Sequence, residues 1–78
     1  MDIEALRSVI SSGLGDCEID MQMDGNKIFL DLVADVFVGL SRVKRQQLVY
    51  SLLNEWIASG EIHAVTMKTV TPDERRNS

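Results

Sequence analysis

Few side chains in this 78-residue sequence could carry chemistry. His63 is the only histidine and Cys17 the only cysteine, so neither an internal disulfide nor a zinc site built from cysteines can form. Neutral imidazole is a common metal ligand, and this is one hypothesis for His63. Composition alone favours the other hypothesis, an ordinary histidine at the end of a strand.

A second feature is the cluster of cations at Arg42, Lys44 and Arg45, directly after Ser41. A solvated basic rim is the simplest interpretation. The alternative is contact with a partner or with nucleic acid, although DNA binding should be weak because the chain has a net charge of −4.

No sequence motif for nucleotide binding or nucleophilic catalysis is present, so enzymatic activity is not expected. Paired carboxylates could act in catalysis, but Glu18, Asp20 and Asp24 fit better as the solvated face of a strand. Met21, Met23 and Met67 could be soft metal ligands and Trp56 a stacking platform. Their periodicity instead predicts packing in the core.

Length and composition predict one domain over residues 1–78 in a cytoplasmic protein. Apolar residues make up 45% of the chain, which argues against disorder, and no apolar run approaches the ~20 residues that span a bilayer. Charge is uneven: residues 1–40 hold eight acids and two bases, whereas residues 41–78 hold six bases and four acids.

Periodicity predicts the elements that must position these groups. Helical spacing follows Asp2, and strict alternation over 17–24 and 28–33 predicts a hairpin that turns at Gly25. A helical turn is expected at 35–38, a long helix at 42–58 with Ser41 as its N-cap, and a third strand at 62–70. Residues 71–78 are expected to be a loose tail with at most a helical stub.

The resulting order, α-β-β-α-α-β, predicts an α+β fold in which a three-stranded mixed sheet carries helices on one face. Because a helical crossover joins the second and third strands, they should be parallel. The third strand, and His63 with it, then starts beside the hairpin turn.

Two segments resemble a known family. Residues 37–50, FVGLSRVKRQQLVY, and residues 62–72, IHAVTMKTVTP, are similar to two separate motifs of BolA-like proteins, in the right order. The resemblance implies a fold like a type II KH domain. It also implies partnership with a monothiol glutaredoxin, with a glutathione-supported [2Fe–2S] cluster shared between the two proteins, and a role in iron homeostasis. Some family members are described as DNA-binding transcriptional regulators.

The family's C-terminal ligand histidine corresponds to His63. Its second ligand, a histidine or cysteine in the hairpin loop, falls on Lys27, so the second ligand here is unknown. Cys17 should lie about 20 Å from the hairpin turn, too far to replace it. Arg75 stands where members usually carry tryptophan, which also favours a loose tail.

The leading expectation is a non-enzymatic glutaredoxin partner, monomeric or weakly dimeric, that holds no cofactor when isolated. The alternatives are a DNA-binding regulator that uses Arg42, Lys44 and Arg45, and a metal-free interaction module.

Overall fold

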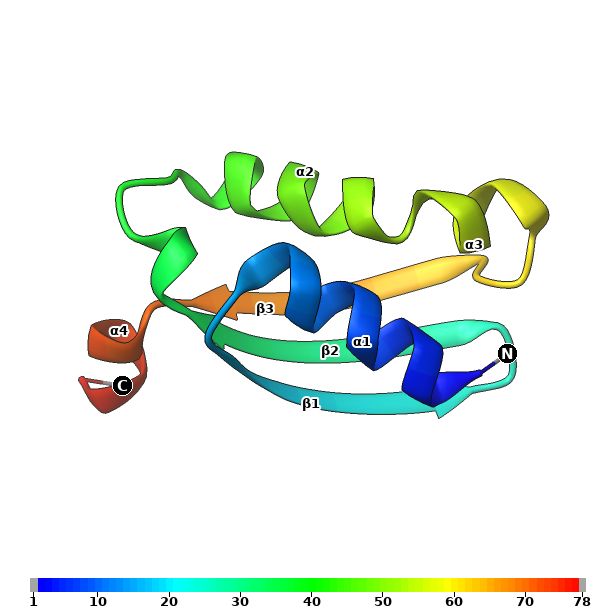
Figure 1. Cartoon of the computed structure of the whole chain (residues 1–78), viewed down its shortest axis with the longest axis horizontal. Helices are drawn as coiled ribbons and strands as arrows, with labels where there is room; N and C mark the ends of the chain where they lie inside the picture. Colours follow the sequence, from blue (N-terminus) through cyan, green and yellow to red (C-terminus); the bar gives the residue numbers. More distant parts are fainter. Residues whose placement is uncertain (1, 78) are drawn as a thin grey trace.

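A computed structural model describes residues 2–77, in which three helices cover one face of a three-stranded sheet and a fourth lies at its end (Figure 1). Helix α1 spans Ile3–Leu14, and strands β1 (Cys17–Asp24) and β2 (Lys27–Ala34) form the hairpin. A 3-10 turn, η1 (Asp35–Phe37), leads to α2 (Arg42–Leu52) and α3 (Asn54–Ser59). Strand β3 (Ala64–Val70) and helix α4 (Pro72–Arg76) follow. The α+β class and the element order are confirmed.

The strands lie in the order β1-β2-β3, with β1 antiparallel and β3 parallel to β2. Asp24 pairs with Lys27 around a two-residue turn in which Gly25 has a φ of 61°. This conformation suits glycine because it has no Cβ, and only Gly25 of the turn requires it. The mixed sheet and the parallel crossover are therefore as predicted.

The core lies between the sheet and helices α1 and α2. Alternate residues of β1 and β2 turn towards the helices, as the sequence pattern predicted, and Leu6, Ile10, Leu32, Phe37 and Leu53 are completely buried. Side chains cap the first turns of α1 and α2. Asp2 accepts hydrogen bonds from two backbone N–H groups of α1, and Ser41 accepts one from the backbone N–H of Lys44 in α2.

The long helix predicted over 42–58 is divided at Leu53. This residue has φ −96° and ψ 4°, and its N–H is shared between the carbonyls of Val49 and Tyr50. Leu53 is completely buried, as is Val49 four residues before it. Trp56 packs against the core but is only partly buried, so the expectation that it belongs to the core was too strong; Ile57, the next residue, is exposed.

The third strand is shorter than predicted, because it begins at Ala64 and not at residue 62. Ile62 is buried in the loop before the strand, and its N–H donates to the carbonyl of Trp56 at 3.1 Å. No helix within residues 2–77 has the length and the apolar character that a membrane crossing requires.

Candidate functional site

His63 lies beside the hairpin turn, where the parallel crossover predicted it. Its backbone N–H donates to the carbonyl of Asn26 at 2.8 Å, and the next residue, Ala64, pairs with Lys27. Its side chain is exposed. The structure therefore places the backbones of His63 and Lys27 at the same end of the sheet.

The loop that carries His63 is held on the helix side as well. Gly60 ends α3 with a φ of 84°, and a Cβ placed on it would stand 3.6 Å from Nε2 of His63. The imidazole therefore lies close to the C-terminal end of α3. Because the buried Ile62 anchors the loop immediately before it, His63 is presented from a fixed backbone.

Within residues 2–77, His63 does not belong to a group of side chains that could hold a metal ion unaided. Among residues 2–77 no group of three or more His, Cys, Asp or Glu side chains could hold a metal ion. The ammonium group of Lys27 offers no lone pair. A metal or cluster at this end could take one imidazole from this chain and would need its other ligands from a second molecule.

Cys17 cannot complete the ligand set at His63. It pairs with Ala34 at the far end of the hairpin, seven strand residues from Asp24 at the turn, which is roughly 23 Å of extended chain. Burial, followed by the negative charge of Asp16, raises the pKa of the Cys17 thiol. The thiolate that metals bind is therefore disfavoured, which agrees with the sequence-based exclusion of Cys17.

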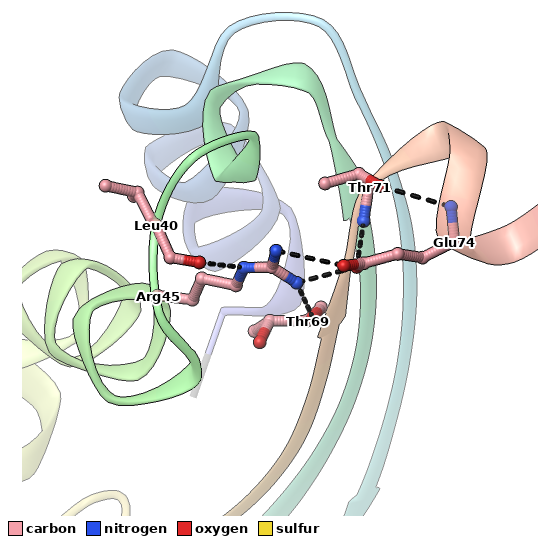
Figure 2. Close-up of polar contacts among 5 residues, drawn as sticks. All are labelled: Leu40, Arg45, Thr69, Thr71 and Glu74. Carbon is pink, nitrogen blue, oxygen red and sulfur yellow. Dashed lines mark hydrogen bonds and ion pairs between the residues drawn. The ribbon is translucent and has the colours of Figure 1, made fainter.

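Arg45 has a structural role that the sequence did not reveal. Its Nε donates to the carbonyl of Leu40 at 3.0 Å, and its Nη1 donates to the carbonyl of Thr69, also at 3.0 Å (Figure 2). Nη1 and Nη2 also donate to the two carboxylate oxygens of Glu74, at 2.7 and 3.1 Å. We call this arrangement the Arg45 clasp, because it joins α2, the end of β3 and α4.

The clasp holds the C-terminal segment in place. Thr71 and Glu74 form a capping box: the Thr71 N–H donates to Glu74 Oε1 at 2.9 Å, and the Glu74 N–H donates to Thr71 Oγ1 at 3.1 Å (Figure 2). The hydrogen bond from Arg45, and then that from Thr71, lowers the pKa of Glu74 to about 2.

The loose tail expected for 71–78 is therefore not what the structure shows over 71–77; Ser78 lies outside the described residues. Arg75 also forms an ion pair with Asp31 of β2, which ties α4 to the sheet at the position where tryptophan was expected. The capping box was visible in the sequence, but its long-range partner Arg45 was not.

The three predicted contact cations do not act as one group. Arg42 and Lys44 are exposed, whereas the side chain of Arg45 is only 12% exposed and is engaged in the clasp. All three lie near the start of α2, at the opposite end of the sheet from His63 (Figure 1). The nucleic-acid hypothesis is left with Arg42 and Lys44 as cations that face solvent.

Phe29 was not among the residues that the sequence singled out. It is the third residue of the central strand, lies on the face away from the helices and is 43% exposed. The signal was present in the alternation of Phe29 with Ile28 and Leu30, which turns the aromatic ring away from the core.

Comparison with known proteins identifies the family. The family model described as BolA-like protein matches residues 20–74. This chain belongs to the BolA-like family. The chain is 40% identical over 74 residues to the acid stress protein IbaG of Escherichia coli, and the match covers 95% of this chain and 88% of that protein.

Solved BolA structures have the same fold. The BolA domain of SufE1 from Arabidopsis thaliana matches with a TM-score of 0.84 and 29% identity, over 91% of this chain and 92% of that chain. BolA1 from the same plant matches with a TM-score of 0.82 and 28% identity, over the same shares of the two chains. The resemblance found in the two sequence motifs is thus confirmed for family and fold.

Proposed function

We propose that this BolA-like protein is a non-enzymatic, cytoplasmic partner of a monothiol glutaredoxin and takes part in iron–sulfur cluster or iron homeostasis. The observation that carries the proposal is the position of His63. It is an exposed imidazole on an anchored loop beside the hairpin turn, and it corresponds to the family's ligand histidine.

The donor set near His63 supports a shared cluster. One imidazole from this chain, with thiolates from glutaredoxin and glutathione, would make a mixed ligand set for [2Fe–2S], and imidazole and thiolate are both ligands that iron accepts. With Lys27 at the second family position, the shared cluster should be labile. The isolated chain should hold none.

The test mixes the protein with monothiol glutaredoxin that carries a glutathione-bound [2Fe–2S] cluster and records visible absorption and circular dichroism. His63→Ala should abolish the spectrum of the mixed complex. Lys27→His should lengthen the lifetime of the cluster, because it restores a ligand at the family's second ligand position. Cys17→Ser is the matched control at the other end of the hairpin and should leave the spectrum unchanged.

Formation of the complex can be followed separately from the cluster. Trp56 is the only tryptophan in the chain, and its carbonyl accepts from the residue that precedes His63. Its fluorescence should report docking at this end even when the cluster is absent. If His63→Ala leaves the cluster spectrum intact, the ligand assignment is wrong, and a metal-free interaction module becomes the better description.

A further inference from the structure

Among residues 2–77, no helix covers the face of the sheet opposite α1 and α2 (Figure 1). The exposed residues of all three strands share this face because the strands are in register: Gln22 pairs with Phe29, and Phe29 with Thr66. Two residues further along the strands, Asp20, Asp31 and Lys68 form the next row on this face. Helix α4 approaches the face only at the end away from the hairpin turn, where Arg75 pairs with Asp31. We call this surface the open face.

Three hollows lie in a row along the open face, and neighbouring hollows share lining residues. The first, of about 260 Å³, contains Phe29 and is bordered by Asp20 and Asp31. These two carboxylates also border the second, of about 200 Å³, which shares Glu18 and Val33 with the third, of about 560 Å³. They follow one another along β1 and β2 towards α4, and we call this row of hollows the track.

The track combines an apolar floor with negative charge. Phe29 supplies the apolar surface, since its ring is 43% exposed, whereas Val33 is buried. Five carboxylates and three cations line the three hollows: Asp16, Glu18, Asp20, Asp31 and Asp35, with Lys68, Arg75 and Arg76.

Two of the three cations already form ion pairs within the chain. Arg75 is paired with Asp31, and Arg76 is paired with Asp73, so the remaining charge along β1 is acidic. A second copy of this chain would bring the same acidic surface against it and would be repelled. A cationic chain would be attracted.

We propose that the open face is a docking site for an extended, lysine- or arginine-rich segment of a partner protein, with apolar side chains at alternate positions. In an extended segment, side chains on one side repeat about every 6.6 Å, which is also the spacing of Phe29, Asp31 and Val33 along β2. Apolar side chains would cover the exposed ring of Phe29, and cationic ones would reach Glu18 and Asp20 on β1. The site is separate from His63 and does not depend on the glutaredoxin proposal.

The experiment uses a fluorescein-labelled peptide that alternates lysine and valine, with a glutamate–valine peptide of the same length as the reference. Fluorescence anisotropy should show binding of the lysine peptide only, and binding should weaken as salt shortens the Debye length from about 30 Å to about 10 Å. In ¹⁵N NMR spectra the shifted amides should lie in β1 and β2 around Asp20 and Phe29, and those around His63 should not move.

Two double variants give the decisive comparison. Glu18→Gln with Asp20→Asn should raise the Kd of the lysine peptide roughly fivefold to thirtyfold, which corresponds to the loss of two exposed ion pairs. Glu4→Gln with Glu55→Gln changes the net charge by the same amount on the helical side and should leave Kd within about twofold. Phe29→Ser should weaken binding at high salt as well as at low salt.

Three results would overturn the proposal. Equal losses in the two double variants would mean that the peptide senses only net charge. Shifts located outside the open face, or no binding at low salt, would remove the docking site. Open-face shifts that depend on protein concentration without peptide would assign the surface to a second copy of the chain.

Discussion

The Arg45 clasp leads to a quantitative prediction for Arg45→Met. Methionine keeps the apolar stem but removes every donor to Leu40, Thr69 and Glu74. A hydrogen bond from a charged donor contributes about 1.5–3 kcal/mol, and the two bonds to backbone carbonyls are partly buried. Allowing for replacement by water, we expect the free energy of unfolding to fall by about 2–4 kcal/mol.

This loss is large for a domain of this size. A 78-residue protein has a total stability of about 4–12 kcal/mol, and each kcal/mol corresponds to about 4–8 °C in Tm. Arg45→Met should therefore lower Tm by at least about 8 °C. Urea unfolding followed by Trp56 fluorescence and by far-ultraviolet circular dichroism measures the change, and amide exchange in 72–76 should increase, because α4 loses its attachment.

The matched control is Arg42→Met, which removes the same charge from an exposed position on the same helix. It should cost no more than about 0.5 kcal/mol. Arg45→Lys keeps the charge but not the planar fork, so it should lose most of what Arg45→Met loses. If Arg45→Met and Arg42→Met are equal within about 0.5 kcal/mol, the clasp does not stabilise the fold and the reasoning fails.

Two further predictions concern core packing and acid. Trp56→Ala should lower the free energy of unfolding in urea by about 2–3 kcal/mol. This is less than the ~3–5 kcal/mol expected for a fully buried ring, because Trp56 is only partly buried. A loss under about 1 kcal/mol would show that its core contacts contribute little. Because the folded-state pKa of Glu74 is lowered to about 2 from its ordinary value of 4.5, its ionised form stabilises the docked α4 above pH 4.5, and this contribution is lost as the pH falls from there towards 2. NMR signals of 72–76 should therefore keep their docked positions down to about pH 4.5, and Glu74→Gln should remove that pH dependence; early release of α4 near pH 6 would contradict the assignment.

Local pattern was enough to predict most of the fold. Alternation in 17–24 and 28–33 is a property of neighbouring residues, and it placed both strands and their buried faces. The caps at Asp2 and Ser41 act within three residues, so they too were visible in the sequence. The position of His63 beside the turn followed from one topological rule, that a helical crossover makes the joined strands parallel.

Tertiary contacts decided what local pattern could not. Arg45 belonged to a plausible basic surface in the sequence, yet Glu74, 29 residues away, engages it in the clasp and secures a tail that was expected to be loose. The break at Leu53 similarly depends on how the helix meets the core. The open-face track exists only because the sheet brings Asp20, Phe29 and Asp31 into adjacent rows. Sequence determines which side chains face outwards from each strand, whereas only the assembled sheet determines which of them become neighbours.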